Sequence, residues 1–367
     1  MRECVVVFYI FFFVASVGYA QDTDSLLSEY SSYPNDTLKV GLLLKKGYAC
    51  RNDDLASAIE FSEASCQTAL LTKDHHYIAK ALNFRATLKA KTGFYQKAAV
   101  DFERALLLFI QMRDTVSQIA ALNNLGNVYT ELNDTNKAEA YFNIGLKLAS
   151  EIENDYWVKG NLLGIATLQM KLKMYAQAEG NFTTLMQMCN FVGEQEIISI
   201  CDLNMGLCKL RNGDTLAAEA YELQALDELQ MMDDTLGECD AYANLAEIYL
   251  AKGNIKECFT FAQLALTIAQ KNNYSEGLLQ TWKVLSGYYK LIGNDKESGF
   301  YLAKCDSALR ANSGSIKNDL SLWYEEKNEN AQTKYLSSNF FWKAVMISLL
   351  ILILAIVLIP QRNEQKE

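Results

Sequence analysis

The chain has 367 residues, of which 50% are hydrophobic, and its formal net charge is −10 at pH 7. This acidic balance disfavours contact with a phosphate backbone, so we expect no nucleic-acid partner. The two prolines, Pro34 and Pro360, lie near the ends, and an interior without proline favours an all-α fold.

Residues 1–20 have the pattern of a secretory signal peptide. Arg2 is followed by an apolar run, and the small residues Gly18 and Ala20 precede a predicted cleavage site before Gln21. The alternative is an N-terminal membrane helix, for which the apolar run is short. A signal peptide would carry the rest of the chain out of the cytoplasm.

Between residues 36 and 311, a pattern of small and large apolar residues recurs with a period of 40 residues. Steps of 40 residues from Ala138 meet small side chains at Ala98, Ala178, Ala218, Cys258 and Ser298. Steps from Gly126 also meet small side chains, at Ala86, Ala166, Gly206, Ala246 and Ser286. Capping residues recur ahead of the first helix of a unit, at Asp74, Asp114, Asn154 and Asp234. The pattern predicts about seven helical hairpins, which must stack because none can bury its apolar face alone.

The stretch from Leu122 to Leu148 resembles a tetratricopeptide repeat. A leucine before Gly126, then Tyr129, Ala138 and Phe142, occupy the relative positions of that family's pattern. The resemblance implies an α-solenoid whose first helices line a concave surface. The usual period of the family is about 34 residues. The longer period here resembles variants in spindle-orienting scaffolds, kinesin light chains and bacterial sensor proteins.

In this family, ligands usually lie on the concave face, at three positions of each first helix. In the second and third hairpins these positions are mainly amides and hydroxyls: Asn83, Thr87, Ala90, Asn123, Asn127 and Thr130. In the fifth and sixth they are mainly apolar: Leu203, Leu207, Leu210, Glu247 and Leu250. We therefore predict a groove for an extended or helical peptide, with amides at one end and an apolar floor at the other. The alternative is a rotated fifth helix with its leucines in the core, which Asp202 and Lys209 at nominal core positions favour.

No sequence pattern of an enzyme occurs in the chain. A nucleophile elbow, a phosphate loop and an H-E-x-x-H motif are all missing. His75 and His76 are adjacent, and on a helix they would point about 100° apart, which makes a shared metal ion difficult. We expect no catalysis, no metal and no cofactor. All cysteines but Cys4 follow the predicted cleavage site, and we expect buried thiols, with Cys50 and Cys66 the one pair to test for a disulfide.

The C-terminal part predicts a membrane anchor. Residues 316–338 carry apolar side chains at helical spacing and predict a linker or capping helix. This segment resembles the linker helix of Bacteroidetes membrane sensors that carry a periplasmic repeat domain. Residues 340–359 contain a single charge, Lys343, and predict a transmembrane helix, with a short tail at 360–367.

The order of these segments predicts a single-pass protein of the cell inner membrane, with periplasmic repeats and a cytoplasmic C-terminus. It resembles Bacteroidetes regulators in which an output domain follows the membrane, but here only eight residues follow Ile359. We therefore predict a sensory input module that binds a protein or peptide and needs a separate cytoplasmic or membrane signalling partner. The alternative is a structural scaffold for an envelope protein complex.

Overall fold

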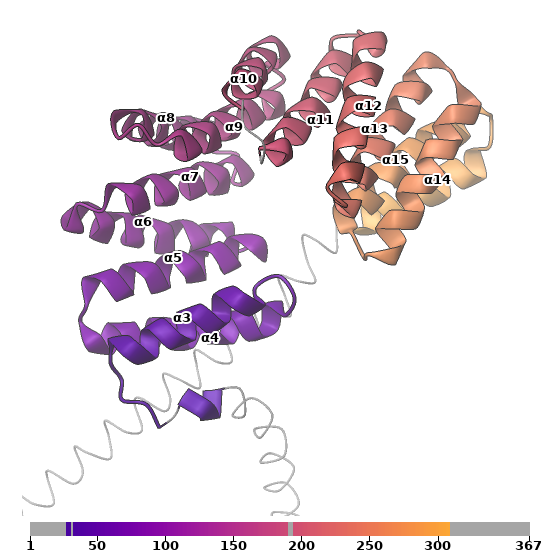
Figure 1. Cartoon of the computed structure of the whole chain (residues 1–367). Helices are drawn as coiled ribbons and strands as arrows, with labels where there is room; N and C mark the ends of the chain where they lie inside the picture. Colours follow the sequence, from indigo (N-terminus) through magenta and orange to yellow (C-terminus); the bar gives the residue numbers. More distant parts are fainter. Residues whose placement is uncertain (1–26, 31, 190–193, 309–367) are drawn as a thin grey trace, which may run out of the picture. The chain divides into compact units, whose positions relative to one another are not determined.

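The structure is a computed structural model that describes residues 27–30, 32–189 and 194–308 (Figure 1). Within these ranges the chain forms α-helices joined by short turns, and no strand occurs there. Helices pair in sequence into antiparallel hairpins, and we call the odd-numbered helix of each hairpin its first helix. The all-α hairpin fold expected from the repeat pattern is confirmed.

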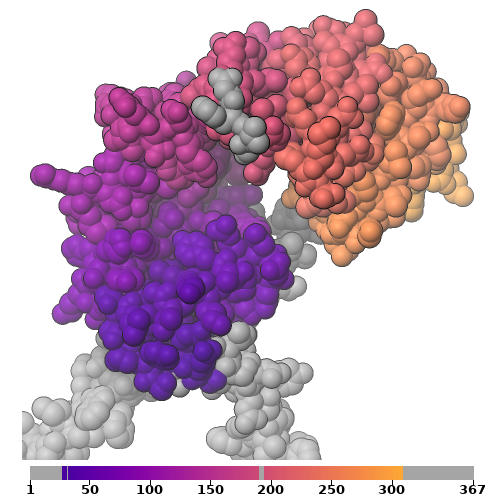
Figure 2. All heavy atoms as spheres, viewed as in Figure 1, coloured from indigo at the N-terminus to yellow at the C-terminus, as the bar shows by residue number. Residues whose placement is uncertain are grey.

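The helices pair as follows: α3 (Thr37–Cys50) with α4 (Leu55–Thr72), α5 (His75–Lys91) with α6 (Tyr95–Met112), α7 (Thr115–Glu131) with α8 (Thr135–Glu151), α9 (Asp155–Lys171) with α10 (Tyr175–Met188), α11 (Gln195–Arg211) with α12 (Thr215–Met231), and α13 (Thr235–Lys252) with α14 (Ile255–Lys271). The last first helix, α15 (Ser275–Leu291), is followed by a helical stretch at residues 295–308. Neighbouring hairpins pack against each other along the chain (Figure 2).

The period of the structure matches the period of the sequence. From α5 to α7 to α9, the first residue moves from His75 to Thr115 to Asp155, a step of 40 residues each time. The predicted caps are also present, because Asp114, Asn154 and Asp234 each accept a backbone N–H three residues ahead through their side chains. These bonds satisfy N–H groups that have no partner inside the helix.

From the second hairpin onward, the turn between the two helices contains one left-handed residue. Glycine supplies it at Gly93, Gly213, Gly253 and Gly293, with φ between 74° and 86°. Other hairpins place a residue with a side chain at the same step, as at Asn133 (φ 58°) and Lys173 (φ 62°). Glycine adopts this conformation without the steric cost that a Cβ atom brings.

The core explains why small residues recur. Phe142 of α8 is fully buried, and it contacts Gly126 of its own hairpin and Gly164 of the next one. A Cβ atom added at Gly126 would lie 2.5 Å from the Phe142 ring, and one added at Gly164 would lie 2.3 Å from it. The same core position is occupied by Phe102 and Phe182, which are also buried.

Several predictions fall outside the described residues. These are the signal peptide (1–20), the linker or capping helix (316–338), the transmembrane helix (340–359) and the tail (360–367). Among the helices that the structure describes, none is both long and apolar enough to cross a membrane. In the same part of the chain, eight cysteines carry free thiols, and all of them except Cys50 are buried.

Candidate ligand-binding surface

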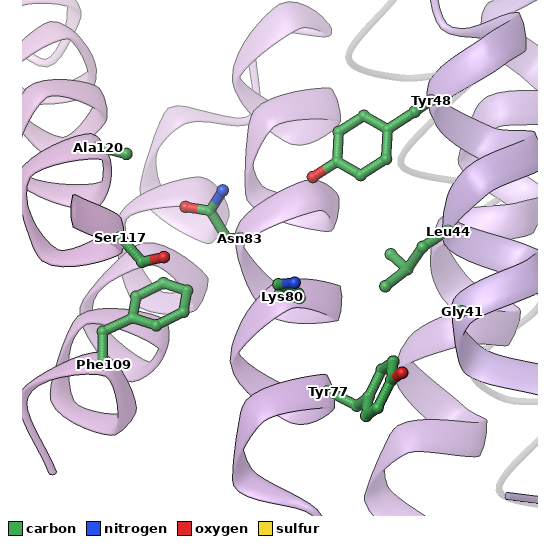
Figure 3. Close-up of a pocket in the computed structure, with 9 residues that line it drawn as sticks. All are labelled: Gly41, Leu44, Tyr48, Tyr77, Lys80, Asn83, Phe109, Ser117 and Ala120. Carbon is green, nitrogen blue, oxygen red and sulfur yellow. The ribbon is translucent and has the colours of Figure 1, made fainter. Parts of the chain in front are cut away.

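First helices from successive hairpins enclose two hollows. The α3–α7 pocket has a volume of about 410 Å³. Its lining residues are Gly41, Leu44, Tyr48, Tyr77, Lys80, Asn83, Phe109, Ser117 and Ala120 (Figure 3). The α11–α15 pocket has a volume of about 460 Å³. Its lining residues are Leu207, Arg211, Glu247, Leu250, Glu276, Leu279, Gln280, Lys283 and Val284.

The α3–α7 pocket combines aromatic walls with a polar centre. Tyr48 packs on the ring of Phe84, with 4.1 Å between ring centroids, and burial raises the pKa of the Tyr48 hydroxyl. The Tyr48 hydroxyl points toward the Asn83 side chain, and Lys80 lies on the same helix as Asn83 (Figure 3). Asn83 Oδ1 is buried and accepts no hydrogen bond from the described residues. The polar groups at the centre of this pocket therefore come from Lys80, Asn83 and Ser117.

The α11–α15 pocket has apolar walls and a charged pair at one side. Leu207, Leu250 and Leu279 come from three successive first helices. Arg211 binds Glu247 in a bidentate pair, with 2.8 Å from Nη1 to Oε1 and 3.2 Å from Nη2 to Oε2. The hydrogen bonds with Glu247 raise the pKa of Arg211. Because the two charges satisfy each other, the pair contributes shape and hydrogen bonding to this pocket more than net charge.

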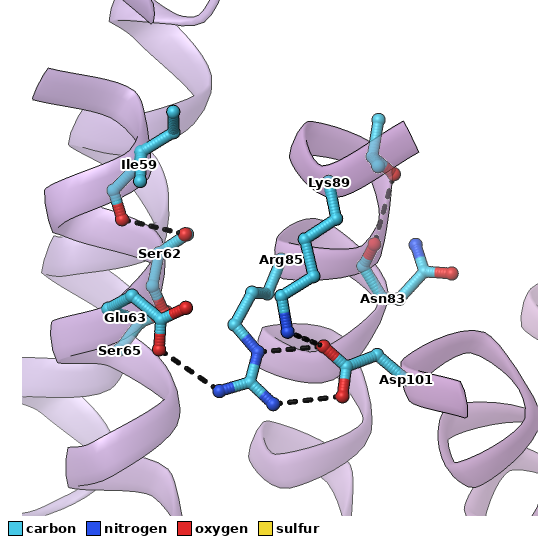
Figure 4. Close-up of polar contacts among 9 residues, drawn as sticks. Ile59, Ser62, Glu63, Ser65, Asn83, Arg85, Lys89 and Asp101 are labelled. Atoms are coloured by element: carbon cyan, nitrogen blue, oxygen red, sulfur yellow. Dashed lines mark hydrogen bonds and ion pairs between the residues drawn. The ribbon is translucent and has the colours of Figure 1, made fainter. Parts of the chain in front are cut away.

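A different group of charged side chains joins hairpins behind the first-helix face (Figure 4). Asp101 of α6 accepts two hydrogen bonds from Arg85, at 2.8 and 2.9 Å, and one from Lys89 at 2.7 Å. Arg85 also binds Glu63 of the preceding hairpin at 3.0 Å. Burial opposes the ionisation of Asp101, but these bonds outweigh it and hold its pKa below the usual value. We interpret this network as structural, since its groups are paired with one another.

Comparison with known proteins identifies the repeats. A family model described as tetratricopeptide repeat matches residues 77–151, and a second model with the same description matches residues 240–272. The chain is a tetratricopeptide repeat protein. No curated protein matches its sequence.

Solved structures share the fold of this tetratricopeptide repeat chain. The apo form of RapI is 13% identical, with a TM-score of 0.62, over 74% of this chain and 98% of RapI. The Rap conjugation gene regulator of plasmid pLS20, in complex with the Phr* peptide, is 13% identical, with a TM-score of 0.61, over 76% of this chain and 75% of the regulator. A tetratricopeptide repeat protein from Parabacteroides merdae is 20% identical, with a TM-score of 0.53, over 77% of this chain and 98% of that one.

The predicted ligand-binding residues of the tetratricopeptide repeats are only partly brought together. Asn83 lines the α3–α7 pocket, whereas Leu207 and Glu247 line the α11–α15 pocket. Accessible side chains outside both pockets are Thr87, Asn123 and Asn127. In this last group, Asn127 Nδ2 lies 3.5 Å from Asn123 Oδ1.

Two of the predicted residues, Thr130 and Leu210, are buried, so the expectation that they face a ligand is corrected. The Thr130 hydroxyl donates to the carbonyl of Gly126 at 2.8 Å, and Leu210 packs with Ala218 and Ile248. Both stand seven residues after the first ligand position of their helix. Leu250 stands at the same step of α13 and lines the α11–α15 pocket, so burial at this step depends on which side chains each neighbouring helix presents.

Helix α11 keeps the register of the other first helices, so the rotated alternative is wrong. Asp202 is fully buried at its nominal core position, where a rotated helix would expose it, and Lys209 reaches Glu179 of α10 at 2.6 Å. Leu207 lines the α11–α15 pocket, whereas Leu203 packs partly buried against the cluster around Ala241 and Leu245. The apolar floor therefore exists at Leu207 but not at Leu210.

Sequence reasoning missed several of the pocket residues. Arg211 follows Leu207 by four residues, and this spacing places two side chains on one helix face, so its position was predictable. Gln280 and Lys283 belong to the seventh hairpin, to which the site prediction did not extend. Tyr48 enters the α3–α7 pocket from the first hairpin, whose spacing departs from 40 residues.

Proposed function

We propose that this chain is a tetratricopeptide repeat module that binds a protein or peptide on the face of its first helices. The observation that carries the proposal is the α3–α7 pocket of about 410 Å³, where Tyr48 and Phe109 form aromatic walls beside the polar side chains of Lys80 and Asn83.

The chemistry of the two pockets favours a peptide. Each has apolar or aromatic walls and a few polar groups, which is typical of ligand sites that bury side chains and orient a backbone. The fold neighbour from plasmid pLS20 was solved with the Phr* peptide, and NprR with its cognate peptide NprX, which supports this class of ligand. Each apolar side chain that a pocket covers would contribute about 1.5–3 kcal/mol. Set against an association cost of about 4–15 kcal/mol, this predicts modest affinity unless several contacts act together.

We further propose that the module is an input domain without catalytic activity, anchored in the cell inner membrane by residues 340–359 and exposed outside the cytoplasm. The support comes from the sequence of residues 1–20 and 340–359. The role would be to report ligand binding to a membrane or cytoplasmic signalling partner.

The test is selection of random peptides displayed on phage against the full chain in detergent micelles, followed by binding measurements on variants. We expect the selected peptides to lose affinity with either Asn83→Ala or Leu207→Lys. For Asn83→Ala, loss of one hydrogen bond predicts a decrease of about 2- to 13-fold. The control is Asn143→Ala, which changes an exposed amide on the second helix α8, outside both pockets, and should leave affinity unchanged. No enriched peptide, or peptides that bind both pocket variants as well as the wild type, would refute the proposal.

A further inference from the structure

A carboxyl group occupies a core position of the fifth hairpin. Steps of 40 residues lead from Phe142 to Phe182 and then to Glu222, and all three side chains are fully buried. Gly206 makes room for Glu222, because a Cβ atom added there would lie 2.4 Å from Glu222 Oε1. Burying an acid costs far more than burying a phenyl ring, so a polar role is expected at this position.

Glu222 begins a chain of hydrogen bonds that leads to the α11–α15 pocket. Asn244 of α13 donates its Nδ2 to Glu222 Oε1 at 3.0 Å. Gln280 of α15 in turn donates its Nε2 to Asn244 Oδ1. Gln280 lines the pocket, whereas Glu222 and Asn244 are buried behind it. These hydrogen bonds, which we call the relay, connect the buried Glu222 of α12 with Gln280 at the pocket through the side-chain amide of Asn244.

The direction of these bonds fixes which end of Gln280 is available. Since Glu222 Oε1 accepts, Asn244 must present its NH₂ group to Glu222 and its oxygen to Gln280. Gln280 then uses its NH₂ group on Asn244. Its Oε1 receives no hydrogen bond from the described residues, which leaves it as an acceptor at the pocket.

The surroundings of Glu222 keep it uncharged. Burial, and then the neighbouring carboxylates, raise the pKa of Glu222 well above its usual value. These carboxylates are Asp240 and Glu247 of α13 and Asp202 of α11, and the relay partner on α15 is an uncharged amide. Of the three, Glu247 is already paired with Arg211. Glu222 Oε2 has no hydrogen-bond partner among the described residues, so the Asn244 amide on Oε1 is the one described donor set against burial and the three carboxylates.

We propose that Glu222 is a positioning residue for the α11–α15 pocket, where its carboxyl, acting through Asn244, orients the oxygen of Gln280 toward a backbone N–H of an extended peptide. This inference rests on the proposed peptide-binding function and names the group of the ligand that the pocket selects. Ionisation of Glu222 makes it a stronger acceptor for the Asn244 NH₂ group and tightens the relay, so peptide affinity rises at alkaline pH.

The first test follows the NMR signals of the Gln280 side chain without any ligand. In the full chain in detergent micelles, labelled with ¹⁵N at its Asn and Gln side chains, the Gln280 amide resonances should shift as the pH rises from 6 to 10. Glu222→Gln keeps the size of the side chain and an accepting oxygen but cannot ionise, and it should abolish the shift. A shift of equal size in Glu222→Gln, or no shift in the wild type, would overturn the relay.

The second test measures the binding of a peptide. The probe is a fluorescent, acetylated Ala-Leu-Ala-Leu-Ala amide, compared with copies in which one backbone nitrogen at a time is methylated. We expect one methylation to weaken binding about ten-fold in the wild type and to have no effect on Gln280→Leu, which has no acceptor. Above pH 8, affinity of the unmethylated probe should rise with pH in the wild type and stay constant in Glu222→Gln.

The two tests separate the two proposals. If the Gln280 resonances titrate as expected but the probe binds at no pH, the peptide-binding function fails, and with it the assigned ligand group. If the probe binds with the same pH dependence in the wild type and in Glu222→Gln, peptide binding stands and the positioning role of Glu222 is wrong.

Discussion

At the scale of single residues, the spacing of glycine and phenylalanine decides how closely the helices approach. Phe142 lies between Gly126 and Gly164, which belong to different hairpins, so one side chain holds two hairpins together. Protein interiors are close-packed, and a gap or an extra methyl at such a contact changes stability directly.

This geometry predicts opposite effects for two glycine-to-alanine changes. In Gly126→Ala, the new Cβ atom would lie 2.5 Å from the Phe142 ring, so we expect a loss of stability of about 1–3 kcal/mol. In Gly180→Ala, no atom lies within 4 Å of the new Cβ atom in helix α10, and replacing a helical glycine should stabilise the chain by about 0.5–1 kcal/mol. Thermal melting of the two variants beside the wild type measures both. A shift in the same direction for both would contradict the packing described here.

Sequence patterns predict such residues unevenly. Gly126, Ala138 and Phe142 were predictable because their neighbours are other copies of the same repeat, and a period of 40 residues therefore encodes their contacts. The place of Asn83 in a pocket was not predictable, since it depends on Tyr48 and Ser117 from the two neighbouring hairpins. The repeat pattern shows Glu222 where other hairpins have phenylalanine. Its partners Asn244 and Gln280 were not predictable, because they stand at positions where the repeats carry different residues.

At the scale of an element, caps and turns define each helix. The sequence predicted the caps well, because an aspartate or asparagine interacts with backbone groups only two or three residues away. It predicted the exposed face of each helix less well. Thr130 and Leu210 are buried by their own local contacts, whereas Leu250, at the same step of α13, stays at the α11–α15 pocket.

The turns inside the hairpins offer a reciprocal test. Lys173 adopts φ 62°, whereas Gly213 holds the same step of the next hairpin with φ 86°. We expect Lys173→Gly to raise the melting temperature, because glycine adopts the left-handed conformation without a cost of about 1–2 kcal/mol. Gly213→Lys should lower it by a comparable amount, and no other atom lies within 4 Å of a Cβ at Gly213 to complicate the result. Unchanged melting of both variants would show that the backbone at these turns carries no strain.

At the scale of the whole molecule, the hairpins differ in whether their buried carboxyl groups have a cationic partner. In the second hairpin, Asp101 lies between Arg85 and Lys89, and its pKa is lowered. In the fifth and sixth hairpins, burial first and then neighbouring carboxylates raise the pKa of Asp202 to about 7, and burial raises that of Asp240 to about 6. The sequence gives the number of charges in each hairpin, but only the packing determines which of them are buried without a cation.

These shifts predict how the stability of the chain depends on pH. A carboxyl whose pKa rises on folding stabilises the fold fully below its unfolded value of about 4. That contribution disappears as the pH rises through the folded values, which are about 7 for Asp202 and about 6 for Asp240. We therefore expect the melting temperature of the full chain to fall between pH 5 and pH 8.

The variant Asp202→Asn tests the cause of this fall. It cannot ionise, and it keeps an oxygen for Gln224, whose Nε2 lies 2.9 Å from Asp202 Oδ2. At pH 8 its free energy of unfolding should exceed that of the wild type by about 1–3 kcal/mol, and its melting temperature should be higher. Asp101→Asn is the matched control, because it removes the negative partner of Arg85 and Lys89 and should destabilise the chain at both pH values. A wild-type melting temperature that rises from pH 5 to pH 8 would mean that the paired carboxylates, rather than Asp202 and Asp240, govern the response.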